Sequence, residues 1–333
     1  MIWRALAAAV LAGSASAFLL WSLDGAGEWF GGHRWMVVLL PLAGWATQWW
    51  GERTGAVFLG TLLTHVCGGS AGREGAAVQV GGAVATAVKA DIRVGMAAGF
   101  GGVFGTPWAG FVFAQEVAGR GAIWVCLAGA FVGDWVARVW GAQHTVYAIS
   151  AWPEWWAIGW AAVAGLAFGL AAAGYRGLVD VVRRHLPITV GGVIVAVVLY
   201  STSAWAFAGL GVPKIAAAFV GPAGAWDWLV KLGLTAVTVG SGFRGGEATP
   251  LFFMGATLGN ALSGLFGVPM GWLAGLGFVA VFGAAARAPL ASTVMAVELF
   301  GPAVIPYALV ACFTADFASR RVQSFWAGYS SRS

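Results

Sequence analysis

Two short segments of the chain combine glycine with charged side chains inside long apolar stretches. Residues 72–75 read Gly-Arg-Glu-Gly, and residues 246–250 read Gly-Glu-Ala-Thr-Pro. Glycines allow backbone amides to converge on one point, and a helix that begins there directs the positive end of its dipole to the same point. The two segments therefore predict an anion site built from helix N-termini. The candidate anion-binding residues are Gly72, Arg73, Gly75, Thr249, Phe252 and Phe253.

Glu74 lies where the first of these helices is expected to begin. A carboxylate in that position competes with a free anion for the same amide donors, and it takes up a proton when the anion displaces it. One such side chain couples an anion flux to a proton flux. The alternative is that Glu74 only forms an ion pair with Arg73 at a helix start. Glu74 and Glu247 are the candidate groups for gating and proton transfer.

Thr249 is expected to cap the second helix, because Pro250 is favoured at the first helical position. The Thr249 hydroxyl can form a hydrogen bond either with the start of its own helix or with a bound ion. The rings of Phe252 and Phe253 either close an apolar constriction or turn their positive edges toward an anion, and at least one of them is expected to serve only in packing.

The composition of the whole chain places these segments in a membrane. Of 333 residues, 60% are hydrophobic and only 9% are charged, and the mean hydropathy is +0.82. This leaves too little polar surface for a soluble globule. We therefore expect an all-α, multi-pass membrane protein. Uncharged runs of spanning length cover residues 5–23, 94–115, 155–175, 188–213 and 248–286.

The N-terminal residues 1–17 share features with a signal peptide. They contain a basic residue, an alanine-rich core and Ala-Ser-Ala at 15–17. Because the apolar run continues beyond residue 17, we expect a retained first helix, and cleavage after residue 17 is the alternative.

Residues outside the two segments argue against several classes of protein. The formal charge of +5 comes largely from pairs such as Arg183-Arg184 and Arg320-Arg321, which are typical of cytoplasmic loops and do not indicate nucleic-acid binding. The three cysteines are widely spaced in apolar segments, so we expect no metal and no cofactor. The sequence lacks the motifs of intramembrane enzymes, and we expect no enzyme activity.

His65 is expected to be a hydrogen-bonded core histidine, with donation to the first segment as the alternative.

The same features recur in the same order in both halves of the chain. After each glycine break come a Gly-Phe-rich stretch, a proline and a second glutamate, Glu116 or Glu298. Broken helices at matching positions are typical of transporters with an ion site between repeats, although small-residue helices also resemble each other through packing alone. Helix capping explains Glu116 and Glu298 at least as well as proton transfer does. The proposed halves are 1–180 and 181–333, and the proposed linkers are 142–153 and 176–187.

The segments resemble motifs of the CLC family of anion channels and proton-coupled exchangers, over about residues 57–301 and more loosely to Tyr329. Residues 72–75 are similar to the family's second anion motif, whose glutamate is the external gate. Residues 246–253 are similar to the third motif as the fluoride-exporting branch carries it, and Tyr329 resembles the inner-gate tyrosine. The resemblance implies a CLC-like inverted repeat with broken and re-entrant helices, a homodimer, and a place in the cell (inner) membrane.

By the same likeness, Glu74 is the gating glutamate, Glu247 and Thr249 belong to the fluoride pathway, and Phe253 is a ring in that pathway. One difference favours the fluoride branch. Chloride exchangers carry a second consecutive glutamate that accepts the internal proton, whereas here Glu116 is followed by Val117. The resemblance then implies fluoride efflux by F⁻/H⁺ antiport, with Glu74 as gate and proton carrier.

Two alternatives stay open at this point. One is a passive chloride or anion channel, and the other is a transport-inactive membrane assembly subunit. The second is supported by the missing first anion motif of the family, since the first half is truncated near residues 50–56. One wall of the usual anion site is therefore expected to differ.

Overall fold

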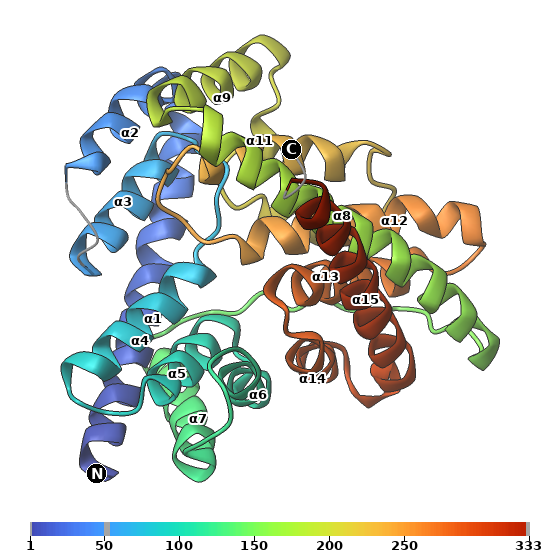
Figure 1. The fold of residues 1–333 in the computed structure, drawn as a ribbon, viewed down its shortest axis with the longest axis horizontal. Helices are drawn as coiled ribbons and strands as arrows, with labels where there is room; N and C mark the ends of the chain where they lie inside the picture. The colour runs from blue at the N-terminus through green and yellow to red at the C-terminus, as the bar shows by residue number, and fades with distance from the viewer. Residues whose placement is uncertain (1, 50–53, 331–333) are drawn as a thin grey trace.

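The computed structural model describes residues 2–49 and 54–330, with side chains described in 2–49 and 55–323 (Figure 1). All regular secondary structure in these residues is helical, as the sequence predicts. The first seven α-helices are α1 (Ile2–Gly32), α2 (Leu40–Gln48), α3 (Thr54–Val66), α4 (Glu74–Ala87), α5 (Ile92–Phe104), α6 (Pro107–Val117) and α7 (Ile123–Val139). The next eight are α8 (Ile158–His185), α9 (Ile188–Thr202), α10 (Val212–Val220), α11 (Asp227–Gly240), α12 (Ala248–Phe266), α13 (Met270–Ala286), α14 (Pro289–Phe300) and α15 (Ile305–Ser330). Four 3₁₀ helices accompany them, η1 (Arg34–Leu39), η2 (Trp155–Ala157), η3 (Trp205–Phe207) and η4 (Pro302–Val304).

Among the described residues, three helical stretches are long and apolar enough to cross a bilayer, namely Ile2–Gly32, Trp155–His185 and Pro302–Gln323. Other uncharged runs break into two shorter helices. The run 94–115 breaks between α5 and α6, where Gly105 has a φ of +70° and Pro107 begins α6. The re-entrant, broken-helix character expected from the sequence follows from these glycine and proline positions.

The two parts of the chain lie side by side (Figure 1). Helices α1 to α7, coloured blue to green, lie on the left, and α8 and α12 to α15 lie on the right. An extended segment of residues 142–154 crosses between them without regular secondary structure. Helix α9 returns to the first part, where it packs against α2.

Helices α6 and α14 cap each other, which reveals the inverted relation between the halves. At the end of α6, Glu116 accepts hydrogen bonds from the backbone N–H groups of Leu290 and Ala291 in the first turn of α14. At the end of α14, Glu298 accepts the equivalent bonds from Trp108 and Ala109 in α6. The two contacts are reciprocal, because the N-terminus of each helix meets the C-terminus of the other. Both glutamates therefore act as helix caps.

The boundary expected at residue 180 lies inside α8, because Arg176 to His185 continue that helix as its last turns. Of the two expected linkers, only residues 142–153 are free of helix. The order of helices instead favours a division within this segment, so that α8 begins the second half. Helix α10 then has no equivalent in the first half, since only residues 49–53 separate α2 from α3. Of the truncated joint expected at 50–56, residues 50–53 lie outside the described residues.

Glycines bring the central helices into backbone contact. A Cβ atom on Gly95 would collide with the carbonyl of Gly81, and one on Gly277 would collide with the carbonyl of Gly255. These pairs join α4 to α5 and α12 to α13, which are helices in extensive contact. The helices that begin at the two glycine-rich segments are thereby fixed against their neighbours.

Candidate functional site

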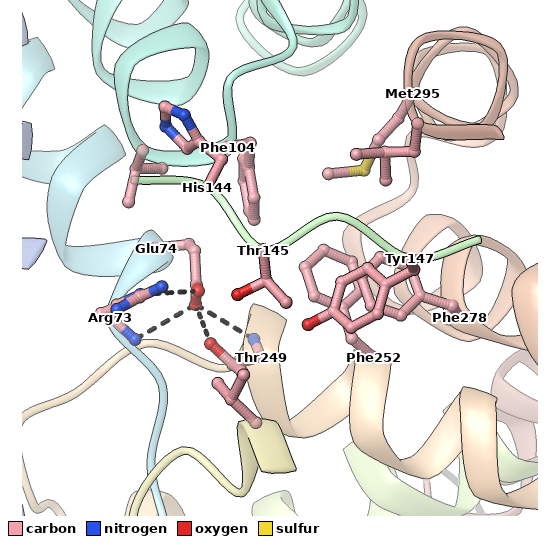
Figure 2. A pocket seen from close by; sticks show the side chains of 13 residues that line it. Arg73, Glu74, Phe104, His144, Thr145, Tyr147, Thr249, Phe252, Phe278 and Met295 are labelled. Carbon is pink, nitrogen blue, oxygen red and sulfur yellow. Dashed lines mark hydrogen bonds and ion pairs between the residues drawn. The ribbon is translucent and has the colours of Figure 1, made fainter. Parts of the chain in front are cut away.

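Glu74 is the first residue of α4, and its side chain points toward the N-terminus of α12 (Figure 2). Its Oε2 atom accepts hydrogen bonds from the backbone N–H groups of Arg73 and Thr249, each at 3.1 Å, and from the Thr249 hydroxyl. The Glu74 side chain is buried. A carboxylate oxygen therefore occupies the point where donors from two helix N-termini converge.

The Thr249 hydroxyl serves this carboxylate and does not cap its own helix. Helix α12 begins at Ala248, with Glu247 as the N-cap residue, and Thr249 is its second residue. The expectation that Thr249 is the cap is therefore wrong by two positions. The physical reason is that α12 begins before Thr249, which places Thr249 in the first helical turn, where its hydroxyl donates to the Glu74 carboxylate.

The two glycine-rich segments meet through their backbones. Gly72 and Gly246 form an antiparallel bridge in which each N–H donates to the carbonyl of the other at 2.6 Å. A Cβ atom on Gly72 would lie 2.8 Å from Cδ of Pro250 and 3.0 Å from the Gly246 carbonyl oxygen, and one on Gly75 would lie 3.1 Å from the Gly246 Cα. Only glycine allows this approach, which brings the N-termini of α4 and α12 together.

Arg73 contacts Glu74, but its main partner lies elsewhere. The Arg73 guanidinium donates to Asp24 of α1 at 2.6 Å, whereas its Nε lies 3.5 Å from Oε1 of Glu74. The Arg73 side chain is nearly fully buried. Arg73 therefore ties the loop before α4 to α1 and leaves the shorter contacts of Glu74 to the backbone and to Thr249.

A cavity of about 50 Å³ lies beside the Glu74 carboxylate (Figure 2). Because a water molecule needs roughly 10–15 Å³ by this kind of measure, the cavity has room for a few particles of that size. Its lining residues are Arg73, Glu74, Val103, Phe104, His144, Thr145, Tyr147, Val212, Thr249, Phe252, Phe278, Met295 and Leu299.

Three lining residues come from the extended segment and were missed from the sequence. His144, Thr145 and Tyr147 cross the cavity between the two halves (Figure 2). The segment was interpreted only as a linker, and its polar residues have no periodicity that would place them at a site. His144 is held there by its Nε2 atom, 3.1 Å from the Gly102 carbonyl oxygen.

The two candidate phenylalanines point in different directions. Phe252 lines the cavity and stacks on Phe278 with ring centroids 4.0 Å apart. Phe253 is not among the lining residues. It is fully buried against Phe207, beneath the Lys231 ammonium 5.3 Å from its ring centroid. The ring beside the cavity is thus Phe252, because consecutive helical residues point about 100° apart.

Glu247 also faces away from the cavity. Its polar neighbours are Tyr175, Arg176, Asp180 and Arg183, all on α8. The bridge between Gly72 and Gly246 makes Ala248, and not Glu247, the residue that corresponds to Glu74 in the second half. Glu74 and Glu247 therefore occupy positions that differ by one residue relative to this bridge.

A buried polar layer supports the loop before Glu74. The Ser70 hydroxyl and the Thr235 hydroxyl lie 3.0 Å apart, and the Ser70 N–H donates to the Thr238 hydroxyl at 3.3 Å. The Nε2 atom of His65 lies 3.1 Å from the Ala71 carbonyl oxygen. His65 is thus the buried, hydrogen-bonded histidine expected from the sequence, and one of its two contacts reaches the loop before Glu74.

Tyr329 lies within α15, but its side chain is outside the described residues. Among the described residues, no group of three or more His, Cys, Asp and Glu side chains could hold a metal ion. The cavity thus offers amide and hydroxyl donors, aromatic walls and one carboxylate. This arrangement can exchange a carboxylate for a small anion at one set of donors.

Comparisons with known proteins show which family the sequence matches. A family model described as voltage gated chloride channel matches residues 42–320. A "Chloride/fluoride channel protein" of Pseudomonas syringae pv. tomato is 40% identical over 379 residues, which cover 95% of this chain and 84% of that protein. A "Putative chloride channel protein ClcB-like" of Ralstonia nicotianae is 30% identical over 305 residues, which cover 76% of this chain and 68% of that protein.

Solved structures of related proteins have the same fold as this chain. The crystal structure of a CLC-type fluoride/proton antiporter superimposes with a TM-score of 0.89 at 30% identity, covering 96% of this chain and 95% of that one. A slow cyanobacterial Cl⁻/H⁺ antiporter shares the fold, with a TM-score of 0.80 at 18% identity and coverage of 96% and 94%.

Proposed function

Because this chain belongs to the voltage-gated chloride channel (CLC) family of membrane proteins, we propose that it exports fluoride in exchange for protons. Members of this family are anion transporters and channels. The F⁻/H⁺ antiport mechanism is supported by the likeness to a CLC-type fluoride/proton antiporter. We place the protein in the cell (inner) membrane as a homodimer, with one anion path in each subunit.

The observation that carries the proposal is the position of the Glu74 carboxylate. Its Oε2 atom accepts the Thr249 N–H and the Thr249 hydroxyl, which are the donors that a bound anion would need. When fluoride takes these donors, Glu74 must leave, and a displaced carboxylate in a membrane interior takes up a proton. Glu74 then returns the proton as it rebinds, so one cycle moves both ions.

Fluoride is a suitable cargo for such a site. It is a small anion that gives up its water reluctantly, so closely spaced hydrogen-bond donors must replace its hydration shell. The Thr249 hydroxyl and the amides at the start of α12 supply them. Protons entering the cell drive anion exit, since each charge that crosses the membrane is worth about 2.3 kcal/mol per 100 mV.

A passive channel for chloride and fluoride is the second candidate. It is favoured by the name of the relative from Pseudomonas syringae, a chloride/fluoride channel protein. The two functions differ in whether fluoride moving down its gradient drives protons uphill.

The test is transport by the purified protein in liposomes, followed with a fluoride electrode and a pH probe, with fluoride and chloride in parallel. We expect fluoride efflux to drive uphill proton movement. The Glu74→Gln variant is expected to lose proton movement completely, because glutamine has the shape of the carboxyl group but does not titrate. Continued proton-driven fluoride transport by this variant would refute the role of Glu74.

The matched control is Glu28→Gln, which changes an exposed glutamate on α1. We expect it to keep wild-type flux and coupling. Wild-type fluoride flux without proton movement would favour the channel. Absence of any fluoride or chloride flux would favour the third alternative, a transport-inactive membrane assembly subunit.

A further inference from the structure

His65 is a buried histidine whose two ring nitrogens both lie against backbone carbonyl oxygens. Its Nδ1 atom lies 2.8 Å from the carbonyl oxygen of Thr61, one turn earlier in α3, and its Nε2 atom lies 3.1 Å from the carbonyl oxygen of Ala71. The residue is only 2% exposed. A carbonyl oxygen only accepts hydrogen bonds, whereas a neutral imidazole has a single N–H donor. Only the doubly protonated ring can therefore donate to both oxygens.

The other histidines of the chain differ from His65 in this respect. His33 and His185 each place Nδ1 near the carbonyl oxygen four residues earlier, at 2.9 and 2.8 Å. His144 has a contact at Nε2, and its Nδ1 atom is buried without a partner. The local contact thus recurs at two other histidines and needs one proton, on Nδ1. The contact from His65 to Ala71 needs a second proton, on Nε2.

The Ala71 carbonyl belongs to the loop that presents donors to the Glu74 site. Ala71 is followed by Gly72, which forms the bridge to the second glycine-rich segment. The next residue is Arg73, whose N–H donates to Oε2 of Glu74. A hydrogen bond from His65 to the Ala71 carbonyl therefore holds this loop against α3, two residues before an amide donor of the site.

The charges around His65 link its protonation to the state of the site. The charged groups that act on the ring are the Lys231 ammonium of α11 and the Glu74 carboxylate of α4. Burial and Lys231 oppose a positive charge on the ring, whereas Glu74 and the two carbonyl oxygens favour it. A negative charge at the site, either the Glu74 carboxylate or a bound anion, therefore strengthens proton binding by His65.

We propose that His65 is a positioning residue that takes up a second proton, on Nε2, and that this proton strengthens fluoride binding at the Glu74 site. The link to fluoride rests on the proposed function, because fluoride must occupy the donors that Glu74 leaves. The proton comes from water, adds to the Nε2 lone pair and is donated to the Ala71 carbonyl oxygen. Coupling between two binding sites is reciprocal, so a proton that is held more tightly beside an anion also makes that anion bind more tightly.

The direct test is ¹⁵N NMR of the purified full chain in lipid bilayers, with label in the histidine rings. The chain has four histidines, so the variants His33→Gln, His144→Gln and His185→Gln assign the remaining signals to His65 without a change at that residue. We expect both ring nitrogens of His65 to have the chemical shift of N–H groups at neutral pH, and Nε2 to lose its proton at alkaline pH. An unprotonated ring nitrogen on His65 from mildly acidic to mildly alkaline pH would overturn the proposal.

The link to fluoride is tested by fluoride titration of the Glu74→Gln variant, which lacks the competing carboxylate. We expect its affinity for fluoride to fall about fivefold or more as rising pH removes the second proton of His65, a typical size for coupling between two sites. Adding His65→Gln should abolish this pH dependence, because glutamine donates to a carbonyl oxygen but does not titrate.

The matched control adds His185→Gln to the same Glu74→Gln variant. His185 is exposed at the end of α8, and its ring makes the same local contact as that of His65. This control should keep the pH dependence of fluoride binding. An equal pH dependence with and without His65 would reject the link to fluoride.

The NMR and transport results separate this proposal from the antiport mechanism. Coupled fluoride transport by wild type, together with a neutral His65, rejects only the role of His65. A doubly protonated His65 in a protein whose fluoride flux moves no protons rejects only the antiport mechanism.

Discussion

The Thr249 hydroxyl is the side-chain donor that meets the Glu74 carboxylate. It lies in the first turn of α12, which begins at Ala248. The same donor is expected to serve fluoride when Glu74 leaves. The same hydroxyl then binds the Glu74 carboxylate in one state and fluoride in the other. Its removal should therefore lower the affinity for the anion more than it lowers the stability of the protein.

We expect Thr249→Val to weaken fluoride binding roughly 10-fold to 100-fold, because a hydrogen bond to a charged group contributes about 1.5–3 kcal/mol. Fluoride titration of the purified protein measures this directly. The matched control is Thr257→Val, two turns along α12, where the buried hydroxyl donates to the carbonyl oxygens of Phe253 and Met254, at 2.8 and 3.4 Å. Equal affinities for the two variants would remove Thr249 from the site.

Lys231 is a fully buried cation that holds a loop against α12. Its ammonium donates to the carbonyl oxygens of Phe207 and Gly209, at 3.0 and 2.6 Å, and lies over the Phe253 ring. These contacts fix the segment that leads into α10. We therefore infer that Lys231 stabilises the folded protein through its hydrogen bonds to these two carbonyl groups.

We expect Lys231→Met to lower the free energy of unfolding by about 1–3 kcal/mol, because it leaves two partly buried carbonyl oxygens without this donor. A thermal melt in detergent monitors the change. Lys89→Met, at an exposed position after α4, is the control and should melt like wild type. A melting temperature unchanged by Lys231→Met would contradict this assignment.

At the scale of helices, the mutual capping of α6 and α14 joins the two halves. Each helix ends in a glutamate that accepts two N–H groups from the start of the other. The donors belong to helix N-termini that are otherwise unsatisfied. From this geometry we infer that Glu116 and Glu298 stabilise the protein as helix caps and do not transfer protons.

We expect Glu298→Ala to destabilise the protein by about 0.5–2 kcal/mol, the usual range for loss of a helix cap. Proton coupling in liposomes should be preserved, because the carboxylate that it removes caps α6 outside the proposed cycle. Melting temperature and coupled flux are measured on the same preparation. Preserved stability with lost coupling would instead identify Glu298 as a proton carrier.

At the scale of the molecule, the proposed anion site lies where two parts of the chain that are distant in sequence meet. Gly72 and Gly246 form hydrogen bonds across the junction, and the extended segment of residues 142–154 closes the cavity from a third direction. Each subunit assembles a complete set of donors from its own chain. Two subunits of a homodimer should therefore transport independently.

We expect complexes that pair one wild-type subunit with one Glu74→Gln subunit to keep about half of the coupled flux per complex. Tandem affinity tags isolate the mixed complex, and single-molecule photobleaching counts its subunits. Complete loss of coupling in the mixed complex would show that the subunits are not independent. A single bleaching step would reject the homodimer.

Much of the fold followed from local sequence properties. The helical membrane class and the family are confirmed. Both could be predicted because apolar runs and glycine or proline breaks determine helix formation locally, within a few residues of the chain. Glu74 could be predicted as a site residue for the same reason, because the glycines beside it and its place at a helix start are visible in four consecutive residues. The boundary at residue 180 was misplaced because a polar stretch such as Arg176 to His185 continues a helix as readily as it links two.

The remaining features depend on contacts between distant segments, which periodicity does not encode. The sequence by itself determined that a carboxylate and two helix N-termini lie inside a membrane protein. Only the tertiary structure decided that Thr249 donates to Glu74, that Phe252 and not Phe253 lines the cavity, and that Glu247 faces Tyr175 and Arg176. The physical reason is helical register: the Gly72 bridge to Gly246 fixes the rotation of α12, and one residue of shift turns each side chain by about 100°.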